Sequence, residues 1–428
     1  MTLTPNTFFA LLILFLTALP SAAQEARIFN TVTTLRTEVD GHLEPLPVIT
    51  LDSDEDFEVS FDVFSHNYHR FVYRLEHLNR RWKPTDELFF TEYAEATQTD
   101  VPIEDYTESQ NVSTNYTHYT FRFPNADMRP LLSGNYRITI LLDEESDEPL
   151  PVAEVYCCVV ENSVAVKGAV TTDTETDYND RHQQVTFDVD CSSLPARDYR
   201  EDIFTTVLQN GRWDNAVIGA PPSTTRLGRL TWDHQRALVF PAGNEYRKYE
   251  ILSARYPGLN VESVGWFPPY IHATIDTDEI RRNYLTTEDQ NGINVIRNTD
   301  NTDDATETEY MVTHFQLHAP EPFYDAEVYL NGKWTTGGIA PEWKLNYNAS
   351  SQCYEGAFML KQGYYNYQYL VVPNGSPLPA PNSQSHTASV EGDFYQTANE
   401  YRILVYFSTP GCRYHRLVGT ALLDSGKR

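Results

Sequence analysis

A two-residue alternation of apolar and polar side chains constrains this chain more than any other feature. In residues 57–63, Phe, Val, Phe and Val alternate with Glu, Ser and Asp. Because successive side chains of a strand point to opposite faces, this pattern predicts a strand with one buried face. The pattern recurs at 117–123, 136–142, 185–189, 364–372 and 401–407.

Clusters of turn-forming residues separate these segments. They occur at 133–135, 210–211, 241–244 and 331–332, a spacing typical of β-sandwiches. The glycines within 133–135 and 242–244 are predicted to need a positive φ. Helical periodicity is weak, and the best helix candidate is 85–95, where Thr85 or Asp86 would cap the start. The chain is therefore predicted to be all-β, built of tandem immunoglobulin-like β-sandwich domains.

The N-terminus predicts export. Residues 8–19 form an apolar run that leads into Pro-Ser-Ala-Ala at 20–23, which indicates a signal peptide cleaved before Gln24. No Lys or Arg precedes the run, so a buried strand or a retained anchor is the alternative. The run is shorter than the roughly 20 apolar residues that span a bilayer, and no later segment approaches that length. The mature chain is expected to be secreted and soluble.

The length of 428 residues predicts more than one hydrophobic core. An acidic loop at 144–151 is followed by the apolar segment 152–160, which should return to the first sheet as a strand. Segment 298–309 is rich in Asp, Glu, Asn and Thr and reads as a second boundary. We therefore predict a signal peptide at 1–23, an N-terminal β-sandwich domain at 24–162, a middle β-sandwich domain at 163–310 and a C-terminal immunoglobulin-like domain at 311–428.

The formal net charge of −28 limits the partners. Nucleic acid is excluded, because phosphate binding requires clustered Lys and Arg. Anionic lipid surfaces would repel the chain, so no direct membrane insertion is predicted and any membrane association would pass through another protein. Two explanations of the charge stay open, a saline habitat and a basic docking partner.

No local motif of catalysis is present: the sequence lacks a GxSxG elbow, an HExxH pair and a phosphate-binding glycine loop. His66 and His69, the acidic cluster 52–56 and the acidic cluster 300–304 lack a complete metal-binding pattern. We predict no catalytic, cofactor-binding or metal residue, no cofactor and no small-molecule ligand. An envelope enzyme whose triad is assembled across domains is a remaining alternative.

The five cysteines are too few and too irregularly spaced for a disulfide scaffold or a zinc site. Cys157 and Cys158 are neighbours in an apolar stretch and would point to opposite faces of a strand. A bridge between Cys353 and Cys412 and a set of buried, inert thiols are the two alternatives.

Several segments carry a more specific signal. They are YRLEHLNRRWKP at 73–84, YTHY at 116–119, FPN at 123–125, SGNY at 133–136, QNGRWDNA at 209–216, AGNEYR at 242–247, LKQGYYNYQY at 360–369, NEY at 399–401 and RLVG at 416–419. In this order they resemble the type IX secretion system plug protein family of the Bacteroidetes. The resemblance runs from about residue 48 to 419. The family pattern places a Cys after the His and an acidic residue before the Trp, where this chain has Leu78 and Arg81.

The resemblance implies a non-catalytic periplasmic subunit. Such a protein sits against the outer-membrane translocon barrel of the type IX secretion system, its protein partner, and closes the periplasmic opening. It would be peripheral to the outer membrane and exported by a cleaved signal peptide. The motif positions that become candidates for partner binding are His77, Asn79, Trp82, Tyr116, His118, Tyr119, Asn125, Trp213, Asn244, Glu245, Tyr364 and Tyr365. The alternative for Trp82, Trp213 and Tyr119 is packing within the sheets.

A second resemblance supports a rival function. Asn331–Gly–Lys–Trp334 and the segment 355–367 are similar to starch- and glycogen-binding sandwich modules, in which a Trp-bearing loop stacks on sugar. The rival is a secreted carbohydrate-binding β-sandwich protein. A shared fold alone does not establish that activity.

Overall fold

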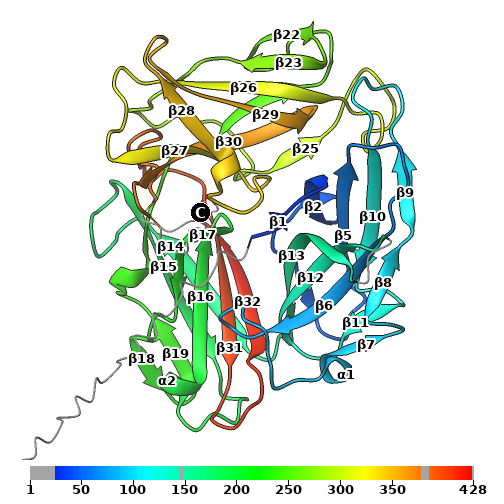
Figure 1. Cartoon of the computed structure of the whole chain (residues 1–428). Coiled ribbons are helices and arrows are strands. Elements are labelled where there is room, and N and C mark those ends of the chain that lie inside the picture. Colours follow the sequence, from blue (N-terminus) through cyan, green and yellow to red (C-terminus); the bar gives the residue numbers. More distant parts are fainter. Residues whose placement is uncertain (1–24, 145–147, 377–384, 427–428) are drawn as a thin grey trace, which may run out of the picture.

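The structure is a computed structural model that describes residues 25–144, 148–376 and 385–426 (Figure 1). The predicted signal peptide at 1–23 lies outside the described residues. Strands dominate, and nearly all neighbouring strands are antiparallel. Within the described part of the chain, no helix is both long and apolar enough to cross a bilayer.

The N-terminal third forms two main sheets that share one core. The first contains β1 (Arg27–Ile28), β13 (Leu150–Val160), β12 (Gly134–Leu142), β6 (Phe71–Leu78) and β8 (Asp100–Ile103), with β4 (Val48–Thr50) parallel to β13. The second contains β3 (His42–Leu43), β2 (Val32–Val39), β5 (Phe57–Val63), β10 (Thr117–Phe123) and β9 (Asp105–Glu108), and a small pair joins β11 (Met128–Pro130) to β7 (Ala94–Ala96). Aromatic side chains from both sheets, including Phe61, Phe71 and Tyr119, fill the core between them.

Two further sheets enclose a second core. One contains β14 (Ala165–Thr171), β15 (His182–Asp190), β19 (Arg229–Trp232) and β18 (Thr224–Arg226), with β20 (Val239–Pro241) on β15. The other contains β17 (Arg212–Ile218), β16 (Ile203–Gln209), β31 (Glu400–Phe407) and β32 (Arg416–Asp424); α2 (Tyr199–Asp202) and η1 (Arg236–Leu238) are short turns nearby. β16 therefore pairs with a strand from the end of the chain. The boundaries at 162 and 310 remain predictions.

The third body is a barrel-like sheet that nearly closes. Its path runs β21 (Arg247–Ile251), β30 (Gly363–Pro373), β27 (Ala326–Asn331), β28 (Lys344–Asn348), β29 (Cys353–Lys361), β26 (Tyr310–His318), β23 (Tyr270–Ile275) and β22 (Val261–Phe267). β24 (Asp278–Glu279) lies on β26, β25 (Asn294–Ile296) lies on β30, and η2 (Pro341–Trp343) precedes β28. The two ends of the path, β21 and β22, approach each other at their bases. Tyrosines of β21 and β30 fill the interior.

The structure confirms the predicted strands. All six alternating segments lie within β5, β10, β12, β15, β30 and β31, and residues 152–160 return to the first sheet in β13. The φ angles of Gly134 and Gly243 are +143° and +64°, which confirms the positive φ predicted for both glycines, although Gly134 begins strand β12.

The helix prediction for 85–95 is wrong. Helix α1 covers only Phe90–Tyr93. Pro84 bridges back to Leu78, and the Thr85 hydroxyl, which the prediction used as a cap, instead bonds buried His77 at 2.9 Å. Tertiary contacts therefore hold the start of this segment out of a helix.

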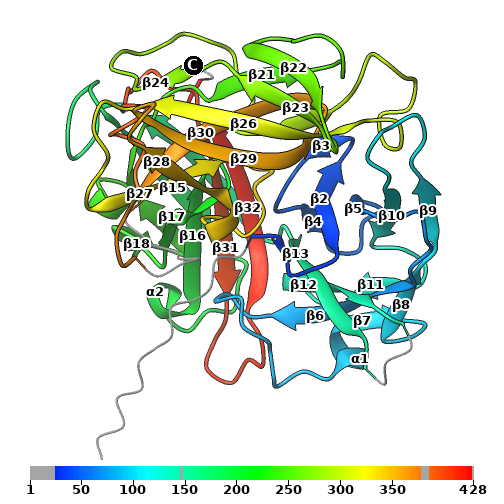
Figure 2. The same cartoon turned by 45° about the horizontal axis from the view of Figure 1, so that its top comes forward.

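A fourth apolar cluster joins the N-terminal sheets to the middle ones. The Trp82 ring lies edge-on to the Trp213 ring, with 5.4 Å between their centroids, and edge-on to the Tyr156 ring, with 5.8 Å between centroids. Leu208 of β16 and Leu417 of β32 complete the cluster. Figure 2 shows β32 beside β13 at this contact. The two regions therefore share a continuous core.

Replacing Trp213, which is 2% exposed, by alanine should destabilise the protein by about 3–5 kcal/mol, because it opens a cavity at this junction. Urea unfolding measures the change. The matched control is Trp266→Ala, whose side chain is 58% exposed and whose loss should change stability by less than about 0.5 kcal/mol. Equal losses in the two variants would contradict the role of the junction.

Candidate functional site: buried polar clusters and motif residues

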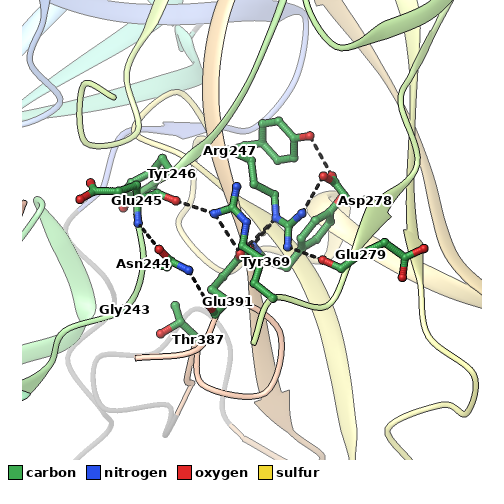
Figure 3. A network of polar contacts seen from close by, with 12 residues as sticks. Gly243, Asn244, Glu245, Tyr246, Arg247, Asp278, Glu279, Tyr369, Thr387 and Glu391 are labelled. Atoms are coloured by element: carbon green, nitrogen blue, oxygen red, sulfur yellow. Dashed lines mark hydrogen bonds and ion pairs between the residues drawn. The ribbon is translucent and has the colours of Figure 1, made fainter. Parts of the chain in front are cut away.

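The first buried polar cluster surrounds Arg247, the first residue of β21 (Figure 3). Its guanidinium donates from Nε to both oxygens of Glu391, at 3.0 and 3.1 Å, and from Nη1 to Asp278 at 2.6 Å. Nη2 donates to the Glu279 carbonyl at 2.9 Å. The Arg247 and Glu391 side chains are 5% and 2% exposed. Such charge-assisted bonds are the strong ones in proteins, so they fix three chain segments to one another.

Tyrosines and a second arginine complete this cluster. The hydroxyls of Tyr367 and Tyr369 each donate to Asp278 at 2.8 Å. Arg281 lies 3.5 Å from Glu391 and donates to the Glu245 carbonyl at 2.6 Å. The charged groups are thus paired inside the protein. The arrangement holds chain segments in place and offers no group poised to react.

Motif residues Asn244 and Glu245 form the edge of the same cluster. Asn244 donates from Nδ2 to the Glu391 carbonyl at 2.9 Å and accepts from the Glu245 amide at 3.0 Å. The Glu245 carboxyl accepts from the Tyr284 hydroxyl at 2.7 Å and from the Ala398 amide at 3.1 Å. The motif at 242–247 therefore builds a loop junction.

The Glu245 carboxyl is protonated more readily than an ordinary one. Burial raises the pKa of Glu245 from 4.5 to about 7, and the nearby Asp289 carboxylate adds to the rise. Burial also raises the pKa of Asp289. The pair holds a proton at mildly acidic pH.

The second cluster centres on Asp62 of β5, whose side chain is fully buried. Lys361 of β29 lies 2.7 Å from Asp62. Tyr310 donates its hydroxyl to Asp62 at 2.6 Å, and His118 approaches the other carboxylate oxygen at 2.7 Å. Lys361 also donates to the Ala305 carbonyl at 2.9 Å. This cluster joins an N-terminal sheet to the barrel-like sheet.

The Tyr116 ring packs against Lys361. The Lys361 ammonium lies 4.1 Å from the centre of the Tyr116 ring, and the Tyr116 hydroxyl donates to the Thr308 carbonyl at 3.0 Å. Burial would raise the pKa of Asp62, but the charges of Lys361 and His118 outweigh it and hold that pKa below its ordinary value. The carboxylate is therefore charged in the neutral range.

The motif residues of the N-terminal region lie mostly in the interior. His77 bonds Thr85, and burial lowers the pKa of His77 to about 4. Asn79 accepts from the Arg81 amide at 2.8 Å and shapes the turn that carries Trp82. The Tyr119 ring stacks on Phe61 with 5.3 Å between centroids.

The remaining motif residues also make internal bonds. Asn125 donates to the Tyr73 hydroxyl at 2.8 Å, Tyr364 accepts from Asn366 at 2.9 Å, and Tyr365 donates to the Lys361 carbonyl at 2.7 Å. The buried candidates are His77, Trp82, Tyr116, Tyr119, Trp213, Asn244, Glu245 and Tyr365, and the half-buried ones are Asn79, His118, Asn125 and Tyr364. The structure does not gather them on one face. It groups Tyr116 with His118 and Trp82 with Trp213.

Trp334 does not offer a sugar platform. It is 9% exposed, its indole donates to the Asn366 carbonyl at 2.7 Å, and its ring lies edge-on to Tyr365. A sugar ring needs an exposed aromatic face for stacking. The position of Trp334 therefore does not support the carbohydrate-binding alternative.

The thiols are unpaired. All five cysteines are free, four are buried, and Cys412 is exposed, so a Cys353–Cys412 bridge is absent. His66 bonds Ser109, and His69 bonds Glu144. Among the described residues, no group of three or more His, Cys, Asp or Glu side chains is arranged to hold a metal ion.

Sequence reasoning missed the two residues at the centre of these clusters. Arg247 and Lys361 fall inside segments that carry the family resemblance, yet their partners Asp278, Glu391 and Asp62 do not. The signal available in the sequence was that Arg247 ends one of these segments and Lys361 is the second residue of the other.

Replacing Lys361 by methionine should destabilise the protein by about 3–5 kcal/mol at pH 7, because it leaves the Asp62 charge buried without its main partner. Chemical unfolding measures the loss. The double variant Asp62→Asn with Lys361→Met should recover most of it, since both buried charges are then gone. A double variant no more stable than Lys361→Met would contradict the account.

Glu245 makes stability depend on pH. Because its folded pKa of about 7 exceeds its ordinary 4.5, its contribution is complete below pH 4.5 and is lost as pH rises through 7. Between pH 5 and pH 8 the wild type should lose about 2–3 kcal/mol relative to Glu245→Gln. Unfolding curves at both pH values measure this, with exposed Glu262→Gln as the control. Wild-type and Glu245→Gln curves that stay parallel would overturn the assignment.

Comparison with known proteins gives a family match for the N-terminal region and a similar solved structure for most of the chain. A family model described as the type 9 secretion system plug protein first domain matches residues 32–159. The crystal structure of a hypothetical protein from Parabacteroides merdae ATCC 43184 is similar over 94% of this chain and 99% of that chain, with 35% sequence identity and a TM-score of 0.88. No curated protein matches. Residues 32–159 are therefore a first domain of the type 9 secretion system plug protein family.

Proposed function

We propose that this chain is a non-catalytic periplasmic plug subunit that closes the periplasmic opening of the type IX secretion outer-membrane translocon barrel. The observation that carries the proposal is the family match at residues 32–159. These residues contain the two sheets and the core of the N-terminal region. They also contain Asp62 and Trp82, through which that region is fixed to the rest of the chain.

The physical requirements of a plug agree with this structure. A subunit that blocks a wide channel works by bulk and stiffness, and it needs no reactive group. Continuous cores and buried ion pairs supply stiffness, because neither permits one region to move without exposing apolar surface or unpaired charge. A plug must also leave when cargo arrives, which calls for a moderate, polar interface. The net charge of −28 suits such an interface with a basic rim.

The location follows from the same proposal. Residues 1–23 would act as a cleaved signal peptide, and the mature chain would be peripheral to the outer membrane through the barrel. We propose no cofactor, no nucleic-acid partner and no insertion into the bilayer.

We also propose a domain arrangement. The N-terminal, middle and C-terminal domains would be tandem immunoglobulin-like β-sandwiches at 24–162, 163–310 and 311–428, with β31 and β32 from the last segment completing a sheet of the middle domain. The motif residues would support partner binding by fixing the loops that carry the contact surface, because most of them are buried.

Affinity purification of the tagged chain from native outer membranes tests the function. We expect a very large barrel protein to co-elute in defined proportion, and a tagged periplasmic protein of similar charge serves as the control. If no barrel co-elutes under conditions that preserve the intact translocon, the plug proposal is wrong.

A further inference from the structure

The hairpin of β22 and β23 presents aromatic side chains to solvent. It stands at the rim of the barrel-like sheet, at the top of Figure 1. Its turn is Pro268–Pro269, and next to it Trp266, Phe267 and Tyr270 are 58%, 70% and 38% exposed. Large apolar side chains gathered at one exposed tip mark an interaction surface more often than isolated ones do.

The tip is also held in shape. The Phe267 ring lies edge-on to His272 with 5.6 Å between centroids, and His272 stacks on His314 of β26 at 5.1 Å. His272 and His314 also bond each other through ring nitrogens 2.8 Å apart. An ordered aromatic side chain loses little conformational freedom on binding, so it is suited to act as an anchor.

The charge pattern of the hairpin differs from that of the chain. Residues 263–275 contain no Asp, Glu, Lys or Arg, although 21% of the chain is charged. Two exposed acidic residues, Glu262 and Asp276, flank this stretch at the base of the hairpin. The surface is therefore an apolar strip that ends at two carboxylates.

The outer edge of β22 is open. β22 pairs with β23 along one side, and within the described residues no strand pairs with its other side, although its base approaches β21. A Cβ atom built on Gly265, midway along the strand, would meet nothing within 4 Å. An edge strand exposes unpaired amide and carbonyl groups and serves as a template for another strand.

We infer that this edge is a docking site for an extended, apolar segment of the translocon barrel that is flanked by Lys or Arg. The segment adds to β22 as a strand, its apolar side chains pack on Trp266 and Phe267, and its basic residues meet Glu262 and Asp276. This mode takes affinity from main-chain bonds and specificity from side-chain contacts. The identity of the partner rests on the proposed function.

The open backbone edge argues against the other occupants. Lipid tails cannot bond the unpaired amides and carbonyls of β22, and an anionic headgroup layer would repel Glu262 and Asp276. A second copy of this chain would bring the same two carboxylates and another net charge of −28 to the contact. Only a partner strand with basic flanks satisfies the backbone groups and the charges together.

Binding of purified variants to the isolated translocon tests the inference. Trp266→Ala with Phe267→Ala should weaken binding at least tenfold, as expected for aromatic anchors. Gly265→Glu should weaken it similarly by placing a charge on the open edge, whereas Gly265→Ala should bind normally. Tyr178→Ala, which removes an aromatic side chain that is 71% exposed in the connection between β14 and β15, is the matched control. All variants should retain the wild-type unfolding temperature.

A photo-crosslinking residue at position 266, with one at 178 as control, identifies the occupant. A crosslinked barrel peptide with Lys or Arg beside an apolar stretch supports the inference. If the barrel co-elutes but the hairpin variants bind it with unchanged affinity, the inferred docking site is wrong and the plug proposal stands. The same holds if position 266 crosslinks only to lipid or to a second copy of this chain. A wild-type chain that never co-elutes with the barrel overturns both.

Discussion

The buried ion pair between Asp62 and Lys361 is the constraint on which the arrangement of this molecule depends. It joins β5 of an N-terminal sheet to β29 of the barrel-like sheet, and Tyr116, His118 and Tyr310 close around it. A buried pair adds little net stability compared with well-packed apolar side chains, but losing one partner is costly. The pair therefore fixes the position of one sheet relative to the other, because separating the two sheets would leave an unpaired charge in a poorly solvated site.

The same logic extends through the rest of the chain. Arg247 joins the start of β21 to Asp278 of β24 and to the loop that carries Glu391. The Trp82–Trp213 contact joins the first sheets to β16 and β17. Segments far apart in sequence are therefore held by contacts that are buried and specific. A body of this kind resists deformation as a whole, which is the property that an obstructing subunit needs. The exposed hairpin at 261–275 is the contrasting element, because no strand of the described residues pairs with the outer edge of β22, and Trp266, Phe267 and Tyr270 are exposed.

Local patterns predicted the strands because the alternation in 57–63 is a direct consequence of strand geometry. They did not predict that Asp62 is buried, since the polar face of β5 looks like a solvent face until β29 and its lysine are placed against it. Pairing of β16 with β31 was likewise invisible, because no local signal specifies a partner almost two hundred residues away. The helix expected at 85–95 does not form there because the Thr85 hydroxyl bonds His77, a tertiary contact that no local pattern specifies. The motifs identified the family, but they marked residues that maintain the fold more than residues that face a partner.

We propose that this chain obstructs a channel by its shape. The most direct measurement is the uptake of a large hydrophilic antibiotic by cells that retain the translocon but lack this chain. We expect greater uptake in these cells, restored to normal by the wild-type gene. Uptake equal to that of the parent strain, with the barrel shown to be present and assembled, would contradict the claim.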